Sequence, residues 1–197
     1  MDEELAAAVR EMRDRQQIYE CLMRYCRGID RFDRELAVSA YHPDAIDDHG
    51  NFVGPADEFI DFAFALHARL QQRTQHHITN HICTIDGDVA EAESYYIYRS
   101  LDKTAPWHSI ASGRYLDRLE RRNGRWGIVE RICLVDVRDG NWDPDGDQFD
   151  GRYMATSRTT DDPSYRRPIR VDRSRITKFA RGLSDMAQAR ADGGEGK

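Results

Sequence analysis

The sequence predicts an α+β fold, in which three N-terminal helices pack against a cone-shaped, curved antiparallel sheet. Up to about residue 70, apolar residues recur at steps of three and four, which indicates helices. Beyond Thr74 the pattern changes to alternation, which is typical of half-buried strands. Helices followed by a run of strands are the order of an α+β domain, and the open end of such a cone is a natural pocket.

Three helices account for the first part of the chain. The first has one apolar face and should end near residues 28–30; the face consists of Ile18, Cys21, Leu22, Tyr25, Cys26 and Ile29. The second is short: Asp33 caps it, because a carboxylate accepts free backbone N–H groups, and Pro43 stops it. The third begins after Gly54-Pro55, since proline is tolerated at the first helical position. Its buried face is Phe59, Phe62, Leu66 and Leu70.

Turn signals separate the strands of the sheet. Residues 45–50 indicate a short polar strand that ends in a turn. A tight turn at 85–88, a longer connection at 102–107 and an Asn-Gly turn within 121–125 divide the alternating region. The predicted strands, which form an antiparallel meander, cover about 75–85, 89–101, 108–120 and 125–136.

The character of the chain changes after Asp136, so we divide it into a cone domain, residues 1–137, and a C-terminal extension, residues 138–197. The extension is rich in Gly, Asp and Pro and then becomes basic, with a possible last helix from Ile169 onward. The basic residues within 152–181 could contact nucleic acid or a membrane. Because aromatic interleaving and an apolar membrane face are lacking, we favour an extended arm across an acidic body or a neighbouring subunit.

Composition excludes several classes of protein. With 40% hydrophobic residues, 32% charged residues and a net charge of −6, the chain is typical of a globular protein that does not bind nucleic acid. Signal-peptide and membrane-span patterns are lacking, so we expect a cytoplasmic protein. The four cysteines show no paired spacing, which favours buried, reduced thiols. The histidines lack a metal-ligand pattern, and phosphate-loop and dinucleotide motifs are missing; we expect neither a metal nor a cofactor.

Tyr25 and Asp30 lie at the end of the first helix. Tyr25 belongs to the apolar stripe, so its ring should be buried with its hydroxyl at a wet or ligand-bearing end. Asp30 follows near the sheet, where a buried carboxylate would need a partner because an unpaired buried charge is costly. The alternative for Asp30 is a turn residue in solvent.

The first long strand supplies histidines as partners for that carboxylate. Because side chains alternate across a strand, His76 and Asn80 share one face, and His77 and His81 share the other. A neutral imidazole suits proton abstraction near pH 7, and a neighbouring carboxylate would hold its tautomer and stabilise the imidazolium. A structural histidine is the alternative. The pattern leaves open which of His76 and His77 enters the cone.

Arg131 lies in the middle of the last, apolar strand, where arginine is unusual. Inside the cone it should pair with a carboxylate or await an anion or a polarised oxygen. The alternative is that it faces solvent.

Four segments in this order make the chain resemble the SnoaL-like branch of the nuclear transport factor two superfamily. They are YCRGID, DRELAVSAYHPDAIDDHGNFVG, the HHITN strand and GRYLDRLERRNGRWGIVERICLVD. The resemblance covers about residues 12–137 and implies the same cone, a cystatin-like roll of three helices and a curved sheet. The extension beyond Asp136 departs from the family pattern, which leaves the lid of the pocket and the substrate open.

Within this superfamily the chain is similar to three kinds of lyase: hexachlorocyclohexane dehydrochlorinases, bile-acid 7α-dehydratases and scytalone dehydratase. The resemblance implies that Asp30 and His76 form a catalytic dyad, with His77 as the one-residue alternative. It also implies catalytic roles for Tyr25, which precedes Asp30 by five residues, and for Arg131, which follows a tryptophan by five.

The resemblance therefore implies a cofactor-independent lyase that removes water from a hydrophobic polycyclic or alicyclic alcohol such as a hydroxysteroid. An isomerase or polyketide cyclase with the same pair, and a non-catalytic small-molecule-binding cone, are the alternatives. Such cones commonly assemble as homodimers or homotrimers. Candidate substrate-lining residues are Tyr41, Asn80, Tyr96, Tyr98, Trp107 and His108.

Overall fold

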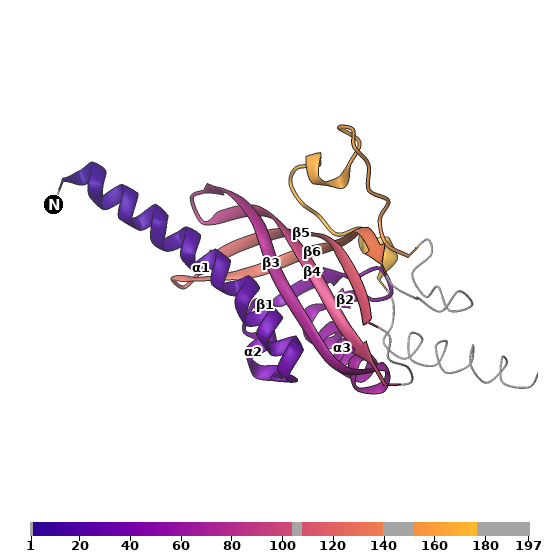
Figure 1. Ribbon diagram of the computed structural model, residues 1–197. Coiled ribbons are helices and arrows are strands. Elements are labelled where there is room, and N and C mark those ends of the chain that lie inside the picture. Colours follow the sequence, from indigo (N-terminus) through magenta and orange to yellow (C-terminus); the bar gives the residue numbers. More distant parts are fainter. Residues whose placement is uncertain (1, 104–107, 140–151, 177–197) are drawn as a thin grey trace, which may run out of the picture.

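The computed structural model describes residues 2–103, 108–139 and 152–176. It has three helices packed on a curved, unclosed sheet of six strands, in the order β2-β1-β6-β5-β4-β3 (Figure 1). The helices are α1 (Glu3–Arg31), α2 (Arg34–Val38) and α3 (Ala56–Leu70). The strands are β1 (Tyr41–Asp48), β2 (Val53–Pro55), β3 (Gln71–Asp86), β4 (Val89–Asp102), β5 (His108–Arg122) and β6 (Arg125–Asp139).

The predicted α+β class is confirmed, and the four long strands lie within a few residues of their expected bounds. Helix α1 begins at Glu3, and its N-terminal half projects beyond the sheet (Figure 1). One feature differs from the prediction: the sheet is not purely antiparallel, because β1 pairs in parallel with β6. Strand β1 also begins earlier than expected, at Tyr41. This pairing brings Asp47 level with Arg131, which links the first and last strands of the cone.

The helices cover the inner face of the sheet, and the main core lies between them. The apolar face of α1 is buried as the spacing predicts, from Ile18 to Ile29. Asp33 caps α2 by accepting a hydrogen bond from the backbone N–H of Leu36 at 3.0 Å. All four cysteines are free, and only Cys83 among them is not fully buried.

A second, smaller core lies on the outer face of the sheet, where residues 152–176, here called the arm, cover it (Figure 1). Ile169 and Val171 of the arm pack against strand residues Leu116, Ile132 and Leu134. An extended arm across the body is thus what the described residues form. The prediction of a last helix from Ile169 onward is wrong for residues 169–176, which contain only a short 3-10 turn, Arg173–Arg175. The rest of that predicted helix lies outside the described residues.

Acidic side chains of the sheet hold the arm in place. The buried Glu130 accepts hydrogen bonds from the backbone N–H of Val171 and from Arg170, the latter at 2.8 Å. In the opposite sense, Arg114 of β5 binds Asp162 of the arm at 2.9 Å. Buried charges need such partners, and the described partners of the Glu130 carboxylate all come from the arm. Arg114 also binds Asp136 and Glu93 of the sheet, so the arm gives it a third carboxylate. In the described part of the chain, no helix is both long and apolar enough to cross a membrane.

Replacement of Ile169 by Ala should lower the free energy of unfolding by about 2–5 kcal/mol, because it removes a buried side chain from the outer core. Urea denaturation would measure the change. Tyr165 lies in the same arm but is 65% exposed, so Tyr165→Ala should change stability by less than about 0.5 kcal/mol. Equal effects of the two variants would contradict the packing of the arm on the sheet.

Candidate active site

The end of α1 carries Asp30 to the first residues of β3. Helix α1 can end against α2 because Gly28 has no side chain: a Cβ there would lie 2.5 Å from the backbone nitrogen of Ala37. Phe32 then turns the chain in the left-handed conformation, with a φ of 54°. As a result, the Asp30 carboxylate projects from the last turn of α1 toward the edge strand of the sheet.

Asp30 and His76 form a hydrogen-bonded pair. Nδ1 of the imidazole lies 2.8 Å from Oδ1 of Asp30, and the backbone N–H of His76 donates to Oδ2, also at 2.8 Å. Thr74 donates a third hydrogen bond to the carboxylate at 3.0 Å. Only 7% of the His76 side chain and 8% of the Asp30 side chain are exposed. The pair is therefore largely protected from water.

The surroundings of Asp30 favour its charged form. Burial by itself raises the pKa of a carboxyl group, but the hydrogen bonds and positive charge of His76 oppose burial and lower the pKa of Asp30 below its usual value. Since an ionised carboxylate can only accept hydrogen bonds, Nδ1 of His76 carries the shared proton. In the neutral imidazole, Nε2 is then left as a base.

The structure resolves the choice between the two neighbouring histidines in favour of His76, since His77 is exposed on the other face of β3. Asn80 does not share the face of His76, contrary to the prediction. The pairing of β3 with β4 shifts register between Ile78 and His81, and this irregularity reverses the alternation. Asn80 is exposed, whereas His81 points inward and binds Ser94 at 2.8 Å.

Aromatic rings and a further histidine surround His76. The ring centroids of Tyr98, Tyr25 and His67 lie 4.8, 6.2 and 6.3 Å from that of His76. Burial, together with the nearby positive charge of His76, lowers the pKa of His67 to about 4, so His67 is neutral at pH 7. His67 was not among the residues predicted for the site. A signal was present, because His67 follows Ala63 by four residues and thus lies on the same face of α3 as that alanine.

Tyr25 is buried as predicted, but its hydroxyl lies beside a second histidine. Its oxygen is 3.2 Å from Nε2 of His49, and Nδ1 of His49 bonds to Asp47. Tyr41 donates to the other oxygen of Asp47 at 2.7 Å. The sequence analysis did not select His49 or Asp47. Their spacing of two residues, which places both on one face of an extended segment, was the signal that could have indicated the pair.

Arg131 faces the interior, so the solvent-facing alternative is wrong. It is fully buried and makes two hydrogen bonds to Asp117, at 2.7 and 2.8 Å, and a third to the hydroxyl of Tyr41 at 3.2 Å. The rings of Tyr25 and Tyr115 cover the guanidinium carbon at 4.4 and 4.3 Å. Asp117 thus neutralises its charge. The cation–π contact with the ring of Tyr25 is then the main electrostatic interaction of Arg131 with the proposed site.

The other expected lining residues occupy different environments. Tyr41 and Tyr96 are buried, and the hydroxyl of Tyr96 donates to the backbone oxygen of Leu134 at 3.0 Å. Tyr98 lies beside His76. His108 is exposed at the start of β5, and Trp107 lies outside the described residues. Of this set, Tyr98 is the residue that the structure places next to the Asp30–His76 pair.

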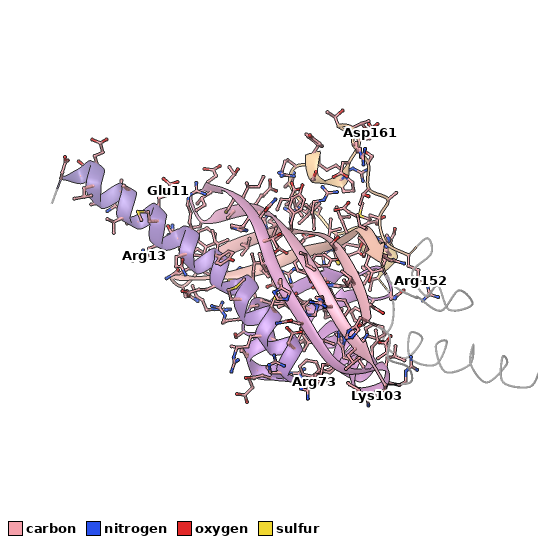
Figure 2. All side chains as sticks on the ribbon, viewed as in Figure 1. Glu11, Arg13, Arg73, Lys103, Arg152 and Asp161 are labelled. Atoms are coloured by element: carbon pink, nitrogen blue, oxygen red, sulfur yellow. The ribbon has the colours of Figure 1, made fainter. Side chains whose placement is uncertain are left out.

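A groove of about 360 Å³ lies near the same end of β3 and β4; it is lined by Arg31, Arg73, Thr74, Gln75, Arg99, Ser100, Leu101 and His108. Figure 2 shows Arg73 at this end of the sheet, close to Lys103. Arg73 and Gln75 alternate with Thr74 and His76 along β3, so their side chains leave the strand on the face opposite the imidazole. Thr74, which donates a hydrogen bond to Asp30, also lines the groove, so the groove adjoins the pair although neither Asp30 nor His76 is among its lining residues. Among the described residues, no three potential metal ligands gather into a cluster.

Replacement of Arg131 by Leu should lower the free energy of unfolding by about 3–5 kcal/mol, because it leaves Asp117 buried without a partner. The double variant Arg131→Leu/Asp117→Leu should be more stable than Arg131→Leu alone. Urea denaturation of both measures this, with Arg122→Leu as the control: the Arg122 pair with Asp44 is exposed, so its loss should cost less than about 1 kcal/mol. A double variant as unstable as the single one would contradict the role of Asp117.

Comparisons with known proteins agree with this architecture. The model of the SnoaL-like domain family matches residues 10–132. Among curated proteins, no sequence matches the chain. A solved protein of unknown function from Mycobacterium tuberculosis is 27% identical, with a TM-score of 0.58 over 66% of this chain and 75% of that one.

Two further solved structures, at lower identity, share the fold. A candidate scytalone dehydratase from Novosphingobium aromaticivorans is 16% identical, with a TM-score of 0.60 over 66% of this chain and 88% of that one. A type 2 hexachlorocyclohexane dehydrochlorinase is 15% identical, with a TM-score of 0.63 over 77% of this chain and 99% of that one. From the match of the family model over residues 10–132, the chain belongs to the SnoaL-like domain family.

Proposed function

We propose that the protein is a cofactor-independent lyase, a dehydratase that removes water from a hydrophobic hydroxylated polycyclic or alicyclic substrate such as a hydroxysteroid. The observation that carries the proposal is the hydrogen bond of 2.8 Å between His76 and Asp30, two side chains that are almost withdrawn from water. A buried carboxylate that holds one imidazole nitrogen prepares the other nitrogen to take a proton.

In the proposed reaction, His76 removes a proton from a carbon of the substrate while Asp30 orients the ring and stabilises the imidazolium. The C–O bond at the neighbouring carbon breaks, and Tyr25 gives its proton to the departing hydroxyl, which leaves as water. The ring of Tyr25 lies 6.2 Å from that of His76, a separation within the span of one polycyclic or alicyclic molecule. Burial raises the pKa of Tyr25 well above its usual value, and the positive charge of Arg131 beneath the ring opposes this rise by favouring negative charge on the phenol oxygen.

The setting of the pair suits an apolar substrate. Tyr98 and Tyr25 present ring surfaces to His76, and Phe59 stacks on His49 nearby at 4.1 Å. Flat apolar walls with a few polar groups are typical of sites for small hydrophobic molecules. The names of two structural neighbours, a candidate scytalone dehydratase and a dehydrochlorinase, also describe eliminations.

An isomerase or a cyclase would use the same base, and only the products distinguish these reactions from an elimination. A purely binding cone has no need of the hydrogen bond between Asp30 and His76, and that contact favours a catalytic site over it.

A panel of 7-hydroxysteroid ketones provides the test, with loss of one water followed by mass spectrometry. His76→Gln and Asp30→Asn should each lower turnover by about 10²–10⁴-fold, the usual contribution of a positioned acid or base, while the circular dichroism spectrum stays unchanged. His77→Gln is the matched control, because His77 is exposed next to His76, and it should retain full activity.

Full activity of the His76 variant would refute the assignment of the base. Products with rearranged bonds and no loss of water would replace the dehydratase by an isomerase.

A further inference from the structure

A second histidine–carboxylate pair, His49 and Asp47, also lies next to Tyr25. Asp47 stands near the end of β1, and His49 follows that strand. Nδ1 of His49 bonds to Asp47, and Nε2 lies 3.2 Å from the hydroxyl of Tyr25. The Tyr25 ring is equally far from both imidazoles, with centroid distances of 6.2 Å to His49 and 6.2 Å to His76.

The second pair is almost completely withdrawn from solvent. Asp47 is fully buried, and 13% of the His49 side chain is exposed. The Asp47 carboxylate accepts hydrogen bonds from both His49 and Tyr41. A carboxylate buried this deeply needs hydrogen-bonding or charged partners, because an unpaired buried charge is costly. His49 is the ionisable side chain in position to be such a partner.

The other titratable groups around His49 come from several elements. They are Tyr25 on α1, Asp48 on β1, His67 on α3, Tyr115 on β5, and Arg131 and Cys133 on β6. Burial alone lowers the pKa of His49, but the charge and hydrogen bond of Asp47, together with Cys133, outweigh burial and raise the pKa to about 10. Asp117 pairs with the positive charge of Arg131, and His67 is neutral at pH 7, so neither side chain displaces the proton on His49.

The protonation state of His49 decides what Tyr25 can do. A neutral His49, with its proton on Nδ1, would accept the Tyr25 proton on Nε2 and withdraw that proton from the reaction. A protonated His49 instead donates from Nε2 to the Tyr25 oxygen. The Tyr25 proton is then free for a substrate oxygen, and the phenol becomes a stronger acid because its oxygen is already hydrogen-bonded to a cation.

We propose that His49 and Asp47 form a second proton-transfer centre, which supplies through Tyr25 the proton that the departing hydroxyl takes up. This inference rests on the proposed dehydratase function. His76 takes the proton from carbon, the C–O bond breaks, and the hydroxyl leaves as water with the proton of Tyr25. The Tyr25 oxygen then takes the Nε2 proton of His49, which stays bound to Asp47 through Nδ1–H. Exchange with solvent removes the proton from His76 and restores the one on His49.

Nitrogen-15 NMR of histidine-labelled full-length protein tests the location of the proton without any substrate. At pH 7.5 the two ring nitrogens of His49 should both carry protons, and Asp47→Asn should make His49 neutral. His49→Gln assigns the signals; Tyr25→Phe, which removes only a hydroxyl, assigns them if His49→Gln fails to fold. A neutral His49 at pH 7.5 in the unaltered protein would overturn the proposal.

Kinetic measurements test whether the reaction uses the His49 proton. The substrate is a 7-hydroxysteroid ketone that the protein dehydrates. His49→Gln and Tyr25→Phe should each lower kcat by about 10²-fold with little change in KM, as loss of a general acid does. The double variant should be no slower than the slower single variant, because the two groups act in series. His81→Gln is the control, since His81 is a partly buried histidine whose contacts are Ser94 and Tyr19.

If the losses in kcat of the two single variants multiply in the double variant, the proposed proton transfer from His49 through Tyr25 is overturned. If none of the ketones loses water, the dehydratase proposal fails on this panel, and the NMR result still decides whether His49 holds the proton.

Discussion

The ion pair between Arg131 and Asp117 is the constraint on which the interior of the cone depends, because a charge buried this deeply is tolerated only with full pairing. Two hydrogen bonds to Asp117 and one to Tyr41 satisfy most of the guanidinium, and tyrosine rings cover it. An apolar side chain in place of Arg131 would remove the group that donates to the Tyr41 hydroxyl. Arg131 thus helps to orient Tyr41, which in turn donates to Asp47. Through Tyr41 and Asp47, the position of His49 is linked to a charge on the neighbouring strand β6.

The Asp30–His76 pair depends on a different constraint, the edge of the sheet. Strand β3 is the last strand in the sheet order, so among the described residues no strand pairs with one side of its backbone. The backbone N–H of His76 donates to Asp30 there instead. One carboxylate therefore fills an open hydrogen-bonding position of the edge strand and also binds the imidazole of the same residue. The two requirements together hold the His76 ring at the end of α1 with little freedom to turn.

Local patterns in the sequence were sufficient to predict the helices and long strands and to place part of the candidate site. The steps of three and four that place Tyr25 on the buried face of α1 depend on helix geometry alone, and the alternation that separates His76 from His77 depends on strand geometry alone. Asn80 could not be placed in this way, because the irregularity before His81 arises from pairing with β4 and leaves no mark in the sequence of β3. The partner of Arg131 was equally hidden, since Asp117 lies on another strand and several carboxylates were available.

The arm shows why the family pattern does not define the whole site. It lies beyond the residues that the family model matches, yet it contacts the segment that directly follows Asp47. Arg175 binds the fully buried Asp48, and the ring of Tyr153 lies where a side chain at Gly50 would be, 2.7 Å from the position of its Cβ. Gly50 also has a φ of +67°, so close packing and backbone conformation both require glycine there. Asp47 thus bonds to His49 from inside the cone, and the arm contacts the residues on either side of His49, Asp48 and Gly50. Because His49 lies beside the Tyr25 hydroxyl, these outer contacts bear on the geometry of that hydroxyl through the backbone of residues 48–50.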